Sequence, residues 1–375
     1  MENVKKDNIL ELESKREEWL NSGKESKLLT DYSLNSFGRS EKKGRLVLIL
    51  DKCEDITDEV KSLRFRSENN EGLPTFCPGQ YITLTIKVSE RFFSKPFTIT
   101  STPSDANDGY YEIIVCKSDD QVSKYLLNTV KVNSIIISSA PSGDFYYDRI
   151  RDTRDVIAIG SEEEIIPIYA MARSLTDGSY HYNMTIFYHA KREKDLFLKN
   201  ELDKLLDETS RLKVIYVLSD EEKNGYQKGY VSLNKIKKEM NDNNTFFISC
   251  QDGMLKYFEK ELEPLNLPIK YIHYYKGKLT CNIRPVQTFN MVIYINGEKY
   301  ETKCYNNKTI LQSILEMGIY IPSKCQNGTC GLCQSELVMG KVKIMDDLRS
   351  ASEKKYNFIH PCVTYPLSDI EIIIR

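Results

Sequence analysis

The feature that constrains this chain most is a cysteine-rich loop. Residues 324–333 read KCQNGTCGLC, so three cysteines follow the spacing C-x4-C-x2-C, and a further cysteine follows in the run His-Pro-Cys that ends at residue 362. This spacing is typical of the thiolate ligands of a [2Fe-2S] cluster, because one tight loop can supply three ligands while a distant segment closes the cage. Gly328 and Gly331 suit such a loop, since its backbone needs positive φ values and its N–H groups must approach the sulfurs. The predicted ligands are Cys325, Cys330, Cys333 and Cys362.

A zinc site with four cysteine ligands is the competing interpretation of this motif. Zinc sites of that kind usually pair two C-x2–4-C hairpins, whereas Cys362 stands alone. The pattern therefore favours the two-iron cluster.

The segments around the motif indicate the kind of domain that carries it. An apolar-periodic helix is predicted at 309–318, just before the loop, and a strand at 370–374. With these flanks, residues 289–375 resemble a plant-type ferredoxin domain. That resemblance implies a β-grasp fold that carries one electron at a time.

Length and composition narrow the class of protein. A chain of 375 residues is too long for one average core and predicts two to four domains. The formal net charge of −2 and the lack of a basic stripe argue against nucleic acid as a partner. No apolar run approaches the length of a membrane span, and residues 1–7 lack the apolar core of a signal peptide. We therefore expect a cytoplasmic protein, in which the other six cysteines are scattered, mostly buried thiols.

Residues 1–44 form a highly charged N-terminal extension. Ile9, Leu12, Trp19 and Leu20 recur at spacings that place them on one face of a helix. Two interpretations stay open: the segment is a helix packed on the body of the protein or is partly disordered, or it is a docking arm for a partner protein.

Residues 45–150 show the period of β-strands. Short alternating runs at 45–50, 60–65 and 78–84 are punctuated by glycine and proline, which predicts a small antiparallel barrel. A further strand at 111–117 and a helix beginning at 121 follow.

Within this region the run KPFTITSTP at 95–103, together with PGQY at 78–81, resembles the flavin-binding domain of the ferredoxin-NADP reductase family. The family signature is Arg-x-Tyr-Ser/Thr and then a strand that ends in Ser-x-Pro. The resemblance implies that Lys95 meets the flavin pyrophosphate, that the ring of Phe97 stacks on the isoalloxazine, and that the hydroxyl of Thr98 hydrogen-bonds the polar edge of the flavin. Lysine in place of arginine gives up the bidentate fork, so flavin is expected to be held less tightly.

A second register of the same signature, at residues 91–94 (RFFS), also fits. We prefer the later one because the Ser-Thr-Pro exit at 101–103 and the position of Pro96 agree only with it. The resemblance also implies that the helix beginning at residue 121 receives the flavin phosphates at its N-terminus. The glycine that the family usually has near this position is absent, and the run at 140–145 (APSGDF) matches the closing turn of the barrel.

Residues 151–275 alternate between strand and helix, which predicts a parallel sheet. Strands are predicted at 156–159, 184–188, 213–217 and 245–249, and helices at 165–175, 196–206 and 254–262. This part, including the run at 225–231, resembles the family's pyridine-nucleotide domain and implies a Rossmann-like fold. Residues 276–288 are then a short linker to the ferredoxin domain.

Two departures from the family pattern leave the use of NAD(P)H open. Where the first turn of the nucleotide domain should be rich in glycine, the chain has Gly160-Ser161 and then three glutamates at 162–164. Carboxylates there either weaken the binding of a phosphate or only stabilise the helix that follows. The nicotinamide-side motif Cys-Gly-Pro is changed to Cys250-Gln251-Asp252, so that Cys250 is either beside a nicotinamide or simply a buried thiol.

The predicted fold class is multidomain α/β and β, with an antiparallel flavin-binding β-barrel, a Rossmann-like parallel α/β domain and a C-terminal β-grasp ferredoxin domain. The candidate cofactor-binding residues are Lys95, Pro96, Phe97, Thr98, Lys117, Val122, Ser123, Ile166 and Cys250.

The resemblance implies an oxidoreductase that passes electrons from a donor such as NAD(P)H through FAD to the [2Fe-2S] cluster and on to a redox partner protein. Two alternatives stay open. One is a non-enzymatic electron-transfer subunit with a degenerate NAD(P)H site, and the other is an assembly protein whose cluster is structural.

Overall fold

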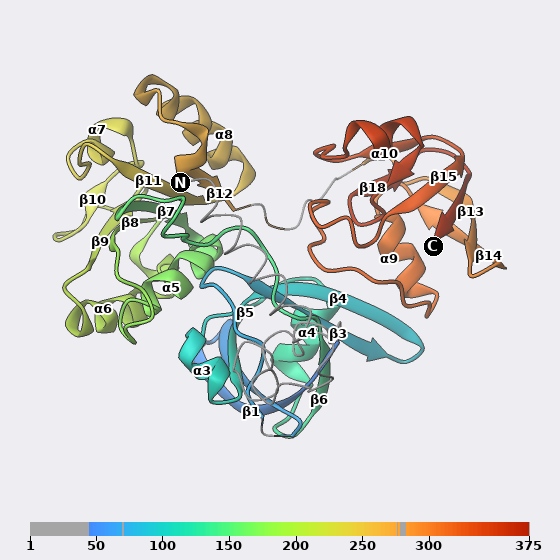
Figure 1. Ribbon diagram of the computed structural model, residues 1–375, viewed down its shortest axis with the longest axis horizontal. Coiled ribbons are helices and arrows are strands. Elements are labelled where there is room, and N and C mark those ends of the chain that lie inside the picture. Colours follow the sequence, from blue (N-terminus) through green and yellow to red (C-terminus); the bar gives the residue numbers. More distant parts are fainter. Residues whose placement is uncertain (1–44, 70, 276, 278–282, 375) are drawn as a thin grey trace, which may run out of the picture. The chain divides into compact units, whose positions relative to one another are not determined.

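The computed structural model describes residues 45–69, 71–275, 277 and 283–374, and these residues form three sheet-containing regions in the predicted order (Figure 1). The helix predicted through Ile9 and Trp19 lies outside the described residues, as does part of the predicted linker at 276–288.

The first region is a six-stranded antiparallel sheet in the order β4-β3-β6-β1-β2-β5. An isolated bridge between Ile99, just after β4, and Ile113 of β5 joins the two edges, so the sheet closes into the predicted barrel. Alternating side chains such as Leu48, Leu63 and Phe65 fill its interior. The elements are β1 (Leu46–Thr57), β2 (Val60–Ser67), β3 (Tyr81–Val88), β4 (Arg91–Thr98), α3 (Pro103–Asn107), β5 (Tyr110–Cys116), α4 (Gln121–Asn128) and β6 (Ile135–Ser138).

The second region is a six-stranded parallel sheet in the order β10-β9-β8-β7-β11-β12, as a Rossmann-like domain requires. Its strands are β7 (Asp155–Ser161), β8 (Asn183–Ala190), β9 (Leu212–Leu218), β10 (Gln227–Lys228), β11 (Asn244–Ser249) and β12 (Ile272–Tyr274). Its helices and 3₁₀ turns are η2 (Glu162–Ile165), α5 (Ile166–Arg173), η3 (Glu193–Asp195), α6 (Lys199–Glu208), α7 (Leu233–Ile236), α8 (Asp252–Leu262), η4 (Glu263–Leu265) and η5 (Ile269–Tyr271).

Strand β7 shows why this sheet is covered on both faces. Val156 and Ala158 belong to one hydrophobic cluster, together with residues of α5 and α6, while Ile157 and Ile159 belong to another with residues of α7 and α8. Successive side chains of a strand point to opposite faces, so a run of apolar residues needs helices on both. The first cluster also contains Phe145 and other residues of the barrel region, which therefore packs against the α5 side.

The third region has the predicted β-grasp arrangement. A five-stranded sheet runs in the order β14-β13-β19-β15-β17, with β19 parallel to β13 and antiparallel to β15. Helix α9 packs its buried Ile310 and Ile314 into the core that the sheet forms. The elements are β13 (Thr288–Ile295), β14 (Glu298–Tyr305), α9 (Ile310–Glu316), β15 (Ser335–Met339), β16 (Val342–Ile344), α10 (Ala351–Lys355), β17 (Phe358–Ile359), β18 (Thr364–Pro366) and β19 (Ile370–Ile374).

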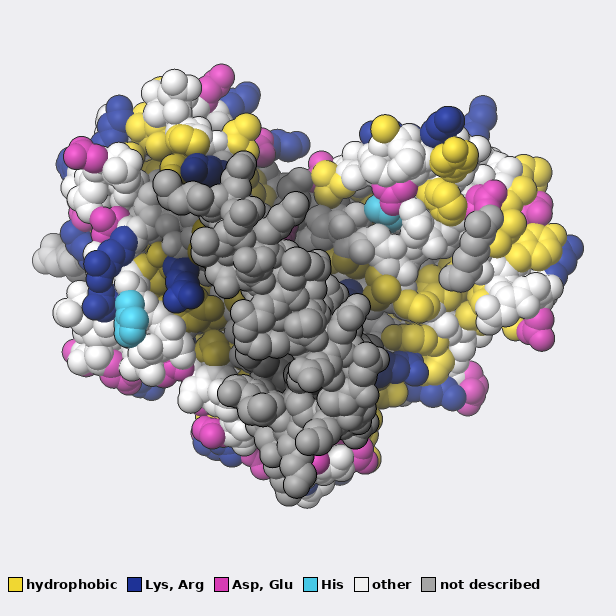
Figure 2. All heavy atoms as spheres, viewed as in Figure 1, with side chains coloured by type: hydrophobic (Ala, Val, Ile, Leu, Met, Phe, Trp, Pro, Cys, Tyr) yellow, Lys and Arg dark blue, Asp and Glu magenta, His cyan; other side chains and the backbone are white. Residues whose placement is uncertain are grey.

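The surface carries charges of both signs. On the face drawn in Figure 2, the described basic and acidic side chains are interspersed. Among the described residues, no helix combines the length and the apolar character needed to cross a bilayer.

Candidate functional site

The four predicted cluster ligands are brought together in the third region. The side chains of Cys325 and Cys330 interact, as do those of Cys333 and Cys362, and Cys325 also contacts Cys362. Hydrogen bonding to Cys330 and then to Cys362 lowers the pKa of Cys325, while the same bond raises the pKa of Cys330. Within the described residues no three or more His, Cys, Asp or Glu side chains surround one point closely enough to hold a single metal ion. Two neighbouring thiol pairs are the donor set that a two-iron cluster needs.

The loop that carries three of these cysteines needs its glycines. Gly328 has φ +82°, a backbone conformation that favours glycine, and a Cβ there would lie in tight contact with Cγ2 of Val363, 3.0 Å away. Gly331 has φ +66° and open space around it. The backbone N–H of Cys330 donates to Sγ of Cys325 at 3.5 Å, which is the kind of N–H to sulfur approach that supports a cluster.

A different set of hydrogen bonds holds the segment that carries Cys362. Nε2 of His360 lies 2.9 Å from Oε1 of Glu353, and Nε2 of Gln334 donates to the same oxygen at 2.9 Å. The carbonyl of Pro361 accepts from the backbone N–H of Leu311 in α9 at 3.0 Å. These bonds place the fourth thiol beside the loop, so the residues present fit a [2Fe-2S] cluster.

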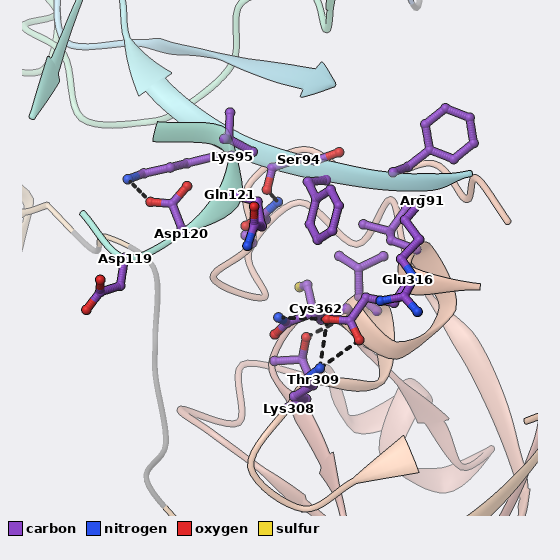
Figure 3. A pocket seen from close by; sticks show the side chains of 17 residues that line it. Arg91, Ser94, Lys95, Asp119, Asp120, Gln121, Lys308, Thr309, Glu316 and Cys362 are labelled. Carbon is purple, nitrogen blue, oxygen red and sulfur yellow. Dashed lines mark hydrogen bonds and ion pairs between the residues drawn. The ribbon is translucent and has the colours of Figure 1, made fainter. Parts of the chain in front are cut away.

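The cluster loop is bonded to the barrel on both sides of its first cysteine. Oγ1 of Thr83 in β3 donates to the carbonyl of Lys324 at 2.6 Å, and Nε2 of Gln326 donates to the carbonyl of Ser94 in β4 at 2.6 Å. A cavity of about 370 Å³ lies at this junction, and its lining includes Lys95 and Cys362 (Figure 3). The strand with the flavin signature and one predicted cluster ligand, Cys362, thus face one space.

Lys95 lies at the N-terminus of α4, where the resemblance places the flavin phosphates. Its Nζ is 2.8 Å from Oγ of Ser123 and 2.7 Å from Oδ2 of Asp120. Asp120 is the N-cap of α4, and its Oδ1 accepts from the backbone N–H of Ser123 at 2.9 Å. Burial acts to raise the pKa of Asp120, but the Lys95 ammonium and the hydrogen bonds outweigh it and lower this pKa to about 2.

This placement supports the later of the two signature registers. Lys95 contacts Ser123 of α4 directly, whereas Arg91 lies at the hairpin end of β4, paired with Val88. An ammonium, a hydroxyl and a helix N-terminus together are a donor set that fits a phosphate group.

The remaining signature residues are spread along and beside β4. Phe97 is buried in the barrel core, with Nζ of Lys95 5.4 Å from its ring centre. Pro96 pairs with Thr83 of β3. The hydroxyl of Thr98 is hydrogen-bonded to the side chain of Tyr275, just after β12.

Two other predicted cofactor-binding residues of the barrel region have no side chain in the group formed by Lys95, Asp120 and Ser123. Val122 points into the barrel core, so only its backbone remains for a ligand. Lys117 forms an exposed ion pair with Glu59 and, among the described residues, makes no hydrogen bond or ion pair with Lys95 or Asp120.

In the nucleotide region the predicted helix at 165–175 begins one residue late, because the three glutamates form the 3₁₀ turn η2 before α5. Glu162 has φ +44° and accepts from Nε2 of Gln251 at 2.9 Å. A Cβ on Gly160 would lie 2.4 Å from Cδ1 of Ile165, so this glycine serves helix packing. Ile166, the first residue of α5, packs partly buried against the core.

Glu163 and Cys250 carry perturbed pKa values on this side. Desolvation raises the pKa of Glu163, although the charge of Lys95 opposes it. Cys250 is buried, its thiol directed to the carbonyl of Ile159 at 3.7 Å, and desolvation raises its pKa to about 12. Of the two interpretations of Cys250, its burial favours the thiol of a hydrophobic core.

The sequence interpretation missed Asp120 and Tyr275. An aspartate directly before a predicted helix is an N-cap signal, so Asp120 could have been found. Tyr275 lies far from Thr98 in the sequence, and no local pattern indicates their contact.

Comparisons with known proteins agree with this arrangement. Residues 47–147 match the oxidoreductase FAD-binding domain, residues 163–260 match the oxidoreductase NAD-binding domain, and residues 293–367 match the 2Fe-2S iron-sulfur cluster binding domain. These matches support FAD, NAD(P)H and a [2Fe-2S] cluster as cofactors.

Several known proteins are similar in sequence to part of this chain. A flavohemoprotein of Oceanobacillus iheyensis is 24% identical over 225 residues, which cover 57% of this chain and 54% of that protein. The chain thus spans about half the length of this and similar relatives. The glycine betaine monooxygenase reductase subunit of Chromohalobacter salexigens is 21% identical over 323 residues, 79% of this chain and 87% of that protein.

Among solved structures, phthalate dioxygenase reductase matches with a TM-score of 0.69 and 18% identity, over 89% of this chain and 99% of that one. That protein is a modular structure for electron transfer from pyridine nucleotides to [2Fe-2S]. This likeness concerns the fold and covers all three regions. The chain therefore combines an FAD-binding, an NAD-binding and a C-terminal 2Fe-2S domain, and in this order of domains it resembles flavoprotein reductases of the ferredoxin-NADP reductase type.

Proposed function

We propose that the protein is an electron-transfer oxidoreductase that passes electrons from NAD(P)H through FAD to the [2Fe-2S] cluster and on to a redox partner protein in the cytoplasm. The observation that carries this proposal is the docking of the cluster loop on the flavin-signature strand. Hydrogen bonds from Thr83 and Gln326 flank Cys325 on both sides and join it to β3 and β4. Short separation between redox centres is what such a chain of transfers requires.

The proposed binding of flavin and cluster can be assigned to particular side chains. A bound flavin supplies the conversion between two-electron hydride chemistry and one-electron transfer. Lys95 and Ser123 would bind its phosphate, Phe97 would contact its ring and Thr98 its polar edge. The four cysteines would hold the irons, and none of these roles requires a general acid or base.

The proposed exit to the partner is the exposed side of the cluster loop. Cys330 is exposed, and neighbouring Leu332 is an exposed apolar side chain. The names of the relatives favour an oxygenase component as the class of electron acceptor, since both the glycine betaine and the phthalate proteins are reductases of oxygenases.

A second candidate function is a subunit that exchanges electrons only with partner proteins. The acidic turn η2 favours it, because Glu162, Glu163 and Glu164 stand where a dinucleotide phosphate would approach. In this alternative the flavin and the cluster keep their roles, while the electron donor is a protein.

The two candidates are separated by anaerobic mixing of the purified protein, loaded with flavin and cluster, with NADH or NADPH. We expect micromolar nucleotide to bleach the flavin and cluster absorption and to produce the paramagnetic signal of a reduced two-iron centre. Dithionite serves as the control that the cluster can be reduced. Reduction by dithionite but by neither nucleotide would support the partner-fed subunit instead.

A further inference from the structure

Three donors around the N-terminus of α4 converge on one carboxylate. Oδ2 of Asp120 accepts from Nζ of Lys95 at 2.7 Å and from Oγ of Ser123 at 2.9 Å. Oδ1 accepts from the backbone N–H of Ser123 at 2.9 Å. The pair of Lys95 and Asp120 is largely shielded, with each side chain 26% exposed. These donors already bind an anion, which is the carboxylate of Asp120 in the chain itself.

The same donors are the ones proposed to bind the flavin phosphate. A charged hydrogen bond is strong because a full charge meets a fixed donor, and a donor already bonded to a carboxylate is not available to a phosphate without losing that bond. Leaving Asp120 in place would bring a carboxylate against a phosphate, and like charges repel strongly in a shielded site. The ammonium of Lys95 has three N–H groups, of which Asp120 and Ser123 take two, so a bound phosphate would share this cation with the Asp120 carboxylate unless that carboxylate moved away.

A second flavin contact is also made by the chain itself. The hydroxyl of Thr98, proposed to meet the polar edge of the flavin, is bonded to Tyr275. The ring of Tyr275 packs edge-on against Phe145, with ring centres 5.3 Å apart. Tyr275 and Phe145 both line a cavity of about 240 Å³ that also reaches Thr329 of the cluster loop. Two separate contacts of the flavin signature are thus occupied by internal side chains.

We propose that Asp120 acts as a built-in competitor of the flavin phosphate, so that the protein holds FAD and FMN weakly and exchangeably and gains little affinity from the phosphate. The inference rests on the proposed function, because it concerns the flavin site of that same pathway. Lys95 remains the cation that would bind the phosphate. The carboxylate of Asp120 determines how much affinity the phosphate adds to flavin binding. Tyr275, through Thr98, adds a second internal contact at the flavin signature.

The experiment compares flavins with and without a phosphate. The full chain, with its cluster loaded and its flavin removed, is titrated with riboflavin, FMN and FAD, and the quenching of flavin fluorescence gives each dissociation constant. Riboflavin and FMN differ only in the phosphate. In the wild-type protein we expect the two constants to agree within about threefold, a difference of less than about 1 kcal/mol.

Asp120→Asn is the test variant, since asparagine is a good N-cap and removes only the charge. We expect it to bind FMN and FAD about tenfold or more tightly than the wild type, with riboflavin unchanged. Asp119→Asn is the matched control, because Asp119 is fully exposed, contacts Lys124 at 3.4 Å and points away from Lys95 (Figure 3). It should leave all three constants within about twofold of the wild type.

Three results would overturn the inference. They are an unchanged or weaker FMN affinity in Asp120→Asn, an equal gain in Asp119→Asn, and an equal gain for riboflavin. Asp120→Ser, which keeps a capping hydroxyl without charge, repeats the test if the asparagine variant does not fold, as judged by its cluster absorption. The titration uses no NADH or NADPH and transfers no electrons, so it can fail while NADH still reduces the cluster, and it can succeed where NADH does not.

Discussion

The ammonium nitrogen of Lys95 lies 2.7 Å from a carboxylate oxygen of Asp120 and ties strand β4 to the N-terminus of helix α4. The bond joins the proposed cation of the flavin site to a residue that the family pattern does not call for. It gives the flavin site an internal anion and gives the barrel a half-buried ion pair. Both consequences can be measured.

The first prediction concerns acid stability. The folded-state pKa of Asp120 is about 2, below its ordinary value of 3.8. A lowered pKa stabilises the fold above the ordinary value, and that stabilisation is lost as the pH falls through the folded value, here between about pH 4 and pH 2. We expect Asp120→Asn to lower the free energy of unfolding by about 2 kcal/mol at pH 7. The difference from the wild type, measured by urea unfolding, should shrink below pH 4, and a constant difference down to pH 3 would contradict the assigned pKa.

The second prediction concerns the cluster ligands. Cys362→Ala should remove the fourth thiolate, so bound iron and sulfide and the signal of the reduced two-iron centre should be lost. Cys304→Ala is the control, because Cys304 is fully buried in the same core but lies on strand β14, outside the loop and the His-Pro-Cys run that carry the four predicted ligands. That variant should lose some thermal stability and keep its cluster. A full cluster in Cys362→Ala would remove this residue from the ligand set.

The third prediction separates backbone strain from steric fit in the cluster loop. Alanine at Gly328 or Gly331 must adopt a positive φ, which costs about 1 kcal/mol in each case. Only alanine at Gly328 also presses on Val363, at 3.0 Å. We expect Gly328→Ala to release its cluster to a chelator several times faster than Gly331→Ala, followed by the decay of visible absorption. Equal rates of cluster release in the two variants would show that the contact with Val363 does not contribute to the need for glycine at residue 328.

The fourth prediction concerns the contact between α5 and the barrel. Nη1 of Arg173 lies 2.9 Å from Oε1 of Glu112 in β5, and both side chains are less than one quarter exposed. Arg173→Met would leave Glu112 without this partner in a shielded place and should lower the free energy of unfolding by about 2–3 kcal/mol. Lys52→Met is the control, because Lys52 and Glu54 form an exposed pair that should contribute less than about 1 kcal/mol. Urea unfolding of both variants measures the difference.

The fifth prediction tests the docking of the cluster loop. Thr83→Val removes the hydroxyl that donates to Lys324 and leaves that carbonyl without this bond. We expect anaerobic stopped-flow mixing with the reducing nucleotide to show several-fold slower reduction of the cluster, with an unchanged cluster spectrum. Thr85→Val, on the same strand, removes only a bond to Ser94 within the barrel and should keep the wild-type rate. Equal rates in the two variants would mean that the Thr83 bond does not position the loop.

Much of the fold could be predicted because it follows local periods. The alternation of strands and helices over 151–275 predicted the parallel sheet that contains β7, and the alternation at 60–65 predicted a strand of the barrel, which is β2. The ends of helices differ from the prediction where contacts with neighbouring segments determine them. The helix predicted from Ile165 begins at Ile166, because the preceding glutamates close a 3₁₀ turn against Gln251 and Tyr188.

The sequence by itself determined the ligand motif of the cluster, since the spacing of Cys325, Cys330 and Cys333 is a property of one short loop. It also determined the order of the three domains, which short-range periods and motifs reveal. Only the tertiary structure decided that Asp120 occupies the anion site of Lys95, because the two residues stand 25 positions apart and meet when α4 packs beside β4. The same holds for Tyr275 and Thr98, whose contact depends on how the end of the parallel sheet meets the barrel. Local sequence patterns report helices, strands and loops, whereas contacts between distant side chains arise from packing.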